Sequence, residues 1–315
     1  MRLLLTHKSA LEYWRLHGKA QDEFSRSRQK SAAPAYYPEF AAICQLATGG
    51  LSLPLDAVVS SRAARRASAA LRSHVFEAPL PRGGVVDVGG GLCVSSPELC
   101  FFWMASELSL VKLIELGFEL CGSYSLPGPV PDEEGAYKRP PLTSTKKLAA
   151  FVAQMEGAHG VRKATQALRY ITDGSASPME TVLVMLLALP YKLGGYGLYM
   201  PELNARVTPA KTAKKIASKS HYYCDLFWPD VDVAAEYDSD QFHTGADRIA
   251  SDSKRRNALA TMGVLVVTVT NQQIRNTVEL EKVAKQLAAG IGKQLRHNEK
   301  PGFRDAQIAL RSQLL

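Results

Sequence analysis

Acidic side chains gather on two neighbouring segments of the chain, 222–228 and 231–238, both of which read as strands. Folded on each other as an antiparallel hairpin, these segments place Asp225 opposite Glu236. Side chains alternate along a strand, so Asp238 shares a face with Glu236 and Asp225. Carboxylates crowded on one patch repel one another unless a cation offsets their charge. Oxygen ligands in small number suit Mg²⁺ or Mn²⁺, so the pattern predicts a divalent-metal site.

The elements that follow would hold the hairpin in place. A helix over 247–262 and an apolar strand over 264–269 complete a strand-helix-strand crossover with a parallel pair of strands. The strand is almost wholly apolar, which is typical of a strand covered on both faces. On the helix, Arg255 and Arg256 either contact phosphate or pair with Asp252 across a helical turn.

An upstream helix adds a further carboxylate. Ser177 opens an apolar helix that reaches about Leu189, and Glu180 lies in its first turn. By its spacing Glu180 completes a capping box, and a metal or water ligand is an equal alternative. His243 lies in a predicted loop, as either a surface residue or a catalytic base. A basic run before the hairpin is either a solvated face or a nucleic-acid contact: Arg206, Lys211, Lys214, Lys215 and Lys219.

Taken in chain order, these residues resemble the PD-(D/E)XK nuclease superfamily, and within it the branch related to very-short-patch repair (Vsr-like) endonucleases. The match covers roughly residues 175–275. Each motif is short, and the specificity comes from their joint order and spacing. The residues that carry the resemblance are Glu180, Asp225, Glu236-Tyr237-Asp238, His243 and Asp252-Arg255-Leu259-Gly263.

The resemblance implies a restriction-endonuclease-like core, a mixed sheet flanked by helices, that hydrolyses phosphodiesters with Mg²⁺ or Mn²⁺. DNA is the expected substrate and RNA the second, in a phage-defence or mobile-element context. By this resemblance Asp225, Glu236 and Glu180 are the metal ligands. The basic residues of the run and of the helix contact the nucleic acid. The catalytic set it implies is Glu180, Asp225, Glu236, Asp238 and His243.

One position departs from the superfamily's pattern. Asp238 stands where its members carry a lysine, two residues after Glu236. This departure motivates a second hypothesis, in which the protein is a catalytically silent nucleic-acid-binding regulator of the antitoxin type. A third hypothesis is an interaction protein that only reuses the fold.

The N-terminal part, residues 1–125, reads as a separate α/β region and loosely resembles AbiEi-like proteins. It contains predicted strands at 55–59, 74–76, 85–88 and 92–94, and helices that begin after Ser96 and Ser109. An Arg/Ala-rich stretch, 60–71, reads as a further helix, either exposed or facing DNA. The resemblance implies an antitoxin-type regulator and allows a protein partner in this region.

Composition limits the remaining choices. The chain has 315 residues and a net charge of +8, which favours a polyanionic partner. No apolar run reaches the ~18 residues of a membrane span, so a cytoplasmic protein without a membrane partner is expected. Five cysteines without a CxxC spacing indicate reduced thiols rather than structural zinc. The predicted organisation is an α/β region at 1–125, a proline-rich linker at 126–145, a nuclease domain at 146–300 and a tail at 301–315.

Overall fold

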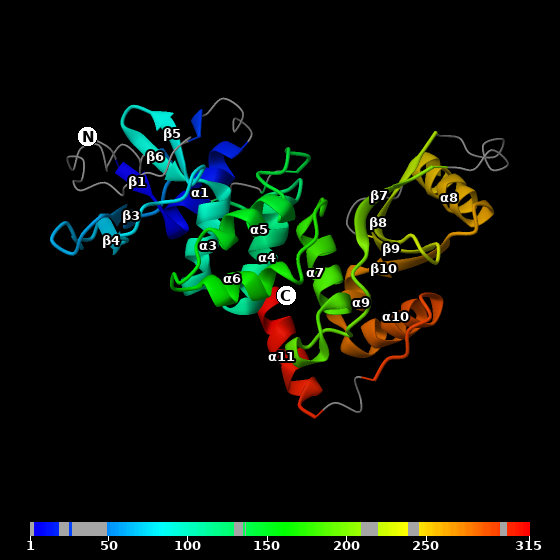
Figure 1. The fold of residues 1–315 in the computed structure, drawn as a ribbon. Coiled ribbons are helices and arrows are strands. Elements are labelled where there is room, and N and C mark those ends of the chain that lie inside the picture. The colour runs from blue at the N-terminus through cyan, green and yellow to red at the C-terminus, as the bar shows by residue number, and fades with distance from the viewer. Residues whose placement is uncertain are drawn as a thin grey trace. The chain divides into compact units, whose positions relative to one another are not determined.

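The structure of the protein is a computed structural model. It describes residues 3–18, 25–26, 49–128, 135, 137–208, 220–238, 246–296 and 301–315, with the backbone alone for 25–26 and 246–253. The chain divides into two units, Met1–Ile171 and Thr172–Leu315 (Figure 1). Each unit is a mixed sheet with helices packed against it, so the predicted α/β class is confirmed. Among the described residues, no helix combines the length and the apolar character that a membrane crossing requires.

The N-terminal unit contains a six-stranded mixed sheet in the order β2-β5-β6-β1-β3-β4. Strand β1 runs parallel to β6 and antiparallel to β3, and its three leucines are all buried. The strands are β1 (Leu3–Leu5), β2 (Ser25–Arg26), β3 (Leu55–Val59), β4 (Leu71–Val75), β5 (Val85–Gly89) and β6 (Leu92–Ser95). The four predicted strands form as β3 to β6, with shifts at their ends, whereas β1 and β2 are not among the predicted strands.

The helices of this unit within the described residues are α1 (His7–His17), α3 (Pro97–Glu107), α4 (Leu110–Cys121), α5 (Thr145–Ala153) and α6 (Val161–Leu168). The predicted caps are confirmed, because Ser96 accepts a hydrogen bond from the Leu99 amide and Ser109 accepts one from Lys112. Helix α3 is buried along almost its whole length. Most of its stabilisation therefore comes from tertiary packing rather than from local propensity.

The helix predicted over 60–71 is wrong. The chain there forms turns and bends, and β4 begins at Leu71. One serine explains the error, because Ser68 accepts hydrogen bonds from the Ala70 and Leu71 amides, which in a helix would bond to carbonyls four residues earlier. Ser73 closes the turn by accepting a hydrogen bond from the Arg66 amide at 2.6 Å. Local side-chain bonding therefore overrides the helical propensity of the alanines.

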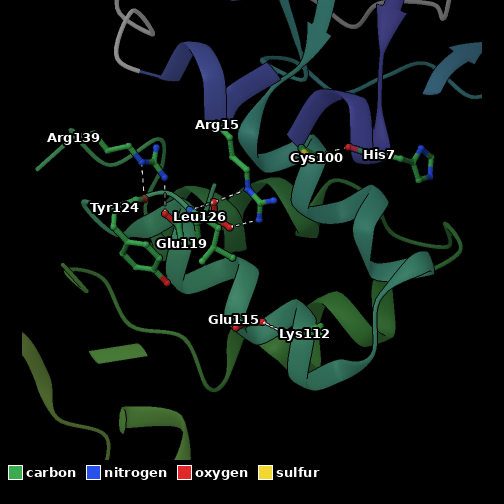
Figure 2. A network of polar contacts seen from close by, with 9 residues as sticks. All are labelled: His7, Arg15, Cys100, Lys112, Glu115, Glu119, Tyr124, Leu126 and Arg139. Carbon is green, nitrogen blue, oxygen red and sulfur yellow. Dashed lines mark hydrogen bonds and ion pairs between the residues drawn. The ribbon is translucent and has the colours of Figure 1, made fainter. Parts of the chain in front are cut away.

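The segment predicted as a linker, 126–145, is bound to the N-terminal unit where the structure describes it. Arg139 is buried and donates from Nε to the Tyr124 carbonyl at 2.6 Å and from Nη2 to the Glu119 carbonyl at 2.9 Å (Figure 2). Leu142 is buried as well. Prolines and glycines mark irregular backbone, but these contacts show that irregular backbone here is part of the core.

Glu119 itself anchors this region. Its carboxylate accepts two hydrogen bonds from Arg15, both at 2.8 Å, and one from the Leu126 amide at 3.0 Å (Figure 2). Helices α5 and α6 pack on α3, so the division between the units falls after Ile171 rather than within the expected linker.

The C-terminal unit is built on a four-stranded sheet in the order β10-β9-β8-β7, against which α7 and α8 lie (Figure 1). The predicted hairpin and crossover both form, since β8 is antiparallel to β9, and β9 is parallel to β10. The elements are α7 (Pro178–Ala188), η2 (Tyr191–Leu193), β7 (Glu202–Val207), β8 (Tyr222–Trp228), β9 (Val233–Asp238), α8 (Ala246–Thr261), β10 (Leu265–Thr270), α9 (Asn271–Arg275), α10 (Thr277–Gly290) and α11 (Phe303–Leu314).

Helix α8 packs on the sheet through Ala258 and Leu259, which share a core with Cys224 and Ala234. The prediction that the last strand is covered on both faces is wrong. Strand β10 lies at the edge of the sheet, and Leu265 is 45% exposed. An apolar run therefore marks this strand correctly, although one face of it meets solvent.

The predicted tail, 301–315, is mostly the helix α11. Phe303 and Leu310 are buried, and Arg311 donates to the Ile274 carbonyl at 2.8 Å. The helix packs against α7 and η2. The last residues thus belong to the core of the C-terminal unit.

Candidate functional site

The first turn of α7 fixes Glu180. The Ser177 hydroxyl accepts a hydrogen bond from the Glu180 amide at 3.1 Å and so caps the helix. In return, Oε2 of Glu180 accepts a hydrogen bond from the Ala176 amide at 2.9 Å. A capping box would use the amide of the next residue, Ser177. Glu180 is 8% exposed. Glu180 can cap the helix and bind a metal at the same time, because one carboxylate has two oxygens.

Asn204 on β7 is the second group that holds Glu180. Its Nδ2 donates to Oε2 of Glu180 at 2.7 Å and to the Gly174 carbonyl at 2.9 Å. Asn204 has a φ of 47°, a left-handed conformation that asparagine tolerates better than most residues. The β7–β8 pairing omits it, because Leu203 pairs with Leu226 and Ala205 with Cys224. The register is the same on both sides of Asn204, so the strand keeps its pairing while the Asn204 side chain reaches Glu180.

The hairpin carries the next carboxylate. Leu226 pairs with Ala235, and one further step along this register sets Asp225 against Glu236. Asp225 then interrupts the ladder, because its Oδ2 accepts the Tyr237 amide at 2.9 Å. A side-chain oxygen here takes the place of a main-chain acceptor.

Glu180 and Asp225 are both buried carboxyls with a raised pKa. Burial raises the pKa of Glu180 and the negative charge of Asp225 raises it further, against hydrogen bonds that lower it. Burial likewise raises the pKa of Asp225, and the Tyr237 amide and Arg255 oppose that rise. Both carboxyls therefore release a proton less readily than a solvated acid. Among the described residues, neither forms an ion pair.

Glu236 has a different environment. Arg255 on α8 donates to both of its carboxylate oxygens, at 2.8 Å and 2.5 Å, and also to the Tyr223 carbonyl. Glu236 is 8% exposed, so this is a buried, bidentate charge pair. Of the two roles considered for Arg255, the structure shows pairing, with Glu236 on the neighbouring strand.

This arrangement tests the fit of a metal to the three predicted ligands. Among the described residues, Glu180, Asp225 and Glu236 do not form a group whose ligand atoms all lie within 4.8 Å of one another. The negative charge of Asp225 acts on Glu180, whereas Glu236 is bound to Arg255. Mg²⁺ usually keeps several waters and uses one or two protein carboxylates, so two carboxylates are enough to hold such an ion. The set of three does not fit it as arranged.

The remaining predicted residues are dispersed. Asp238 lies at the exposed end of β9, and Arg256 is exposed on α8. Arg206 lies on β7, where Nη2 is 3.4 Å from Nδ1 of His221. The rest of the predicted set lies outside the described residues: Lys211, Lys214, Lys215 and His243.

Sequence reasoning missed a polar cluster in the N-terminal unit. Ligand atoms of His7, His74 and Glu107 lie within 4.8 Å of one another. Within the described ranges, this is the one group of three or more possible metal ligands that lie so close together. His74 also meets Asp56, from Nε2 to Oδ1, at 2.8 Å. These residues are far apart in the chain and share no motif, so only the fold reveals them.

Comparison with known proteins identifies two similar proteins of Mycobacterium tuberculosis, one from strain CDC 1551 / Oshkosh and one from strain ATCC 25618 / H37Rv. Each is described as an uncharacterised protein and is 25% identical to this chain over 144 residues. The match covers 46% of this chain and 46% of each relative, so it spans less than half of either protein. No protein-family model matches the chain, and no solved structure matches it.

Proposed function

We propose that the C-terminal unit is a Mg²⁺- or Mn²⁺-dependent nuclease that acts on DNA, with Glu180 and Asp225 as its metal ligands. The observation that carries the proposal is the pair itself: two buried carboxyls, both with raised pKa, held on α7 and β8. Buried acids whose pKa is shifted in this way are candidates for functional sites. The order α7-β7-β8-β9-α8-β10 supports the assignment, because it agrees with the resemblance found in the sequence.

Each residue of the site has a task in this proposal. Glu180 and Asp225 hold the ion, and Asn204 fixes the Glu180 carboxylate through its hydrogen bond of 2.7 Å. A bound divalent ion would polarise a phosphoryl oxygen and lower the pKa of the attacking water. Arg255 supplies the cation for the substrate phosphate. An incoming phosphodiester competes with Glu236 for that guanidinium, and release of Glu236 adds its carboxylate to the site.

The second candidate function is nucleic-acid binding without cleavage. The observation that favours it is the buried Arg255–Glu236 pair, since a carboxylate bonded at both oxygens is not available to a metal. Asp238 in the lysine position points the same way. In this function the basic surface binds the nucleic-acid backbone, and metal has no part in it.

A cleavage assay separates the two functions. Supercoiled and linear DNA, and a single-stranded RNA, are incubated with the full chain in Mg²⁺, Mn²⁺ or EDTA. We expect DNA cleavage that needs the metal and that falls at least about 100-fold in Asp225→Asn and in Glu180→Gln. Asp230→Asn is the matched control, because Asp230 is an exposed acid at the hairpin turn.

The outcomes assign the function. Metal-dependent cleavage by the parent and the control, but not by the two site variants, supports the nuclease. Salt-sensitive binding that survives EDTA and Asp225→Asn, without cleavage, supports the silent regulator instead. Cleavage that survives both site variants contradicts the assigned ligands.

A further inference from the structure

The N-terminal unit contains a partly open cavity of about 530 Å³ that no part of the nuclease proposal uses. Its volume lies in the range of small-molecule and cofactor sites. The lining combines aromatic rings with two arginines from the 60–71 turn. The residues that matter to the argument are His7, Phe76, Phe102, Trp103, Arg62 and Arg65.

A stack of rings forms part of the cavity. The His7 and His74 rings lie 3.7 Å apart between centroids and are inclined by 19°, and His7 lies 5.5 Å from Trp103 at 23°. The buried Asp56 carboxylate holds His74 at 2.8 Å. The ring is therefore oriented by a carboxylate, as in many sites where histidine acts.

The backbone of His7 is strained. Its φ is 44°, a conformation that non-glycine residues seldom adopt, and it lies at the start of α1 directly after β1. Burial first, and then the neighbouring His74, lower the pKa of His7 to about 3. The ring is thus neutral at physiological pH and acts as an aromatic surface. Strain in a buried residue of this kind often marks a functional position.

Trp103 provides an independent observation. Its indole Nε1 is buried and has no hydrogen-bond partner among the described residues. Trp103 is 9% exposed and lines the cavity. A buried N–H without an acceptor is uncommon in folded proteins, and each instance calls for an explanation.

A shared metal ion explains this cluster poorly, although His7, His74 and Glu107 come close together. An imidazole nitrogen binds a metal in the plane of its ring, at about 2.0–2.1 Å. Two nearly parallel rings stacked at 3.7 Å cannot both direct such a lone pair at one ion. The geometry favours a flat aromatic surface over a metal centre.

We propose that this cavity binds a nucleoside phosphate. The planar base packs against the aromatic side of the cavity, the Trp103 N–H donates to an acceptor on the base, and Arg62 and Arg65 bind the phosphate. The same chemistry is found in a free nucleotide and in the terminal nucleotide of a single strand. The inference does not rest on hydrolysis by the C-terminal unit.

Calorimetry with the full chain carrying Asp225→Asn, in EDTA, tests the inference apart from the nuclease. The probes are AMP, GMP, CMP and UMP, short single-stranded DNA with and without a 5′-phosphate, and inorganic phosphate. We expect saturable binding of at least one mononucleotide or of the 5′-phosphorylated strand. Comparison of these two kinds of probe shows whether the cavity takes a free nucleotide or the end of a strand. Inorganic phosphate alone should bind at least tenfold more weakly.

Variants locate the binding. Arg62→Ala/Arg65→Ala should lower the affinity at least tenfold, and both side chains are exposed, so folding is not at risk. Trp103→Phe keeps an aromatic ring, loses the donor and should lower the affinity several-fold. Arg82→Ala, an exposed arginine on another turn, should change nothing.

Three results would overturn the proposal. One is no binding of any nucleotide or strand up to about 1 mM, the weak end of ordinary substrate affinities. Another is binding that the arginine pair and Trp103→Phe both leave unchanged. The last is one equivalent of Zn²⁺ bound by the parent and lost in His7→Ala, because a metal centre would then occupy the cluster.

Discussion

The two units treat buried carboxylates differently. Among the described residues of the N-terminal unit, three buried acids have a basic partner: Glu119 pairs with Arg15, Asp56 with His74 and Glu12 with Lys8. The fourth, Glu98, accepts the Thr143 hydroxyl at 2.6 Å. In the C-terminal unit Glu236 has the same kind of partner, in Arg255. Glu180 and Asp225 have amide donors instead of an ion pair, and the pKa of each is raised. In the proposed function, the two carboxyls without an ion pair are the ones that take up a cation when a metal binds.

The largest effect is expected where a compensated charge loses its partner. Arg15→Met leaves the Glu119 carboxylate, which is 1% exposed, buried without its cation. We expect the free energy of unfolding to fall by about 3–5 kcal/mol, as measured by urea denaturation. The control is Lys282→Met, which removes an exposed ion pair with Glu279 and should cost less than about 1 kcal/mol. Equal losses of unfolding free energy in the two variants would show that the buried ion pair stabilises the protein no more than the exposed one.

The next effect concerns the support of the proposed site. Asn204→Ala removes the donor to Glu180 without touching a proposed ligand. We expect Mn²⁺ affinity and cleavage each to fall about 10–100-fold, the usual cost of losing a group that orients a ligand. Calorimetry and the plasmid assay measure the two quantities. Unchanged values in a folded variant would show that Glu180 needs no such support.

Removal of Arg255 would leave Glu236 as Glu180 and Asp225 are, a buried carboxylate without an ion pair among the described residues. Arg255→Met leaves Glu236 without its cation, so we expect the free energy of unfolding to fall by about 1–3 kcal/mol. Mn²⁺ affinity should rise, because a third carboxylate becomes available, while cleavage should fall with loss of the phosphate contact. Arg256→Met, an exposed neighbour on α8, should alter neither. Metal affinity that is no higher in Arg255→Met would argue against Glu236 as a third ligand.

The smallest effect is on pH dependence. The pKa of Glu180 is raised on folding, so its contribution to stability is complete below its ordinary pKa and is lost as the pH rises through the folded value. Glu180→Gln removes that loss. We therefore expect the variant to match the parent near pH 4 and to exceed its Tm by about 1–4 °C at pH 7 without metal. A variant that is less stable at pH 7 would show that capping outweighs the buried charge.

How far the sequence predicts this molecule depends on the range of the contacts. The caps at Ser96 and Ser177, the hairpin and the crossover all follow from neighbouring residues, and they form as predicted. The helix over 60–71 fails because serine side chains bond to local amides. The boundary at Ile171 and the burial of Arg139 depend on contacts with α3 and α4, which no local pattern contains.

The candidate site shows the same limit. Order and spacing single out Glu180, Asp225 and Glu236, but they do not predict that Arg255 takes Glu236. Asn204 escapes notice because its role depends on a left-handed backbone conformation and on a contact between β7 and α7. The histidine stack joins residues from α1 and β4, and periodicity within either element gives no sign of it.

The most direct test of the central claim is a Mn²⁺ titration of the full chain and of Glu180→Gln/Asp225→Asn by calorimetry. If the two carboxyls await a cation, the parent binds about one ion with release of protons at pH 6, since metal ligands must be deprotonated. The double variant then binds none while remaining folded. A parent that binds no Mn²⁺, or a double variant that binds it equally well, would contradict the account.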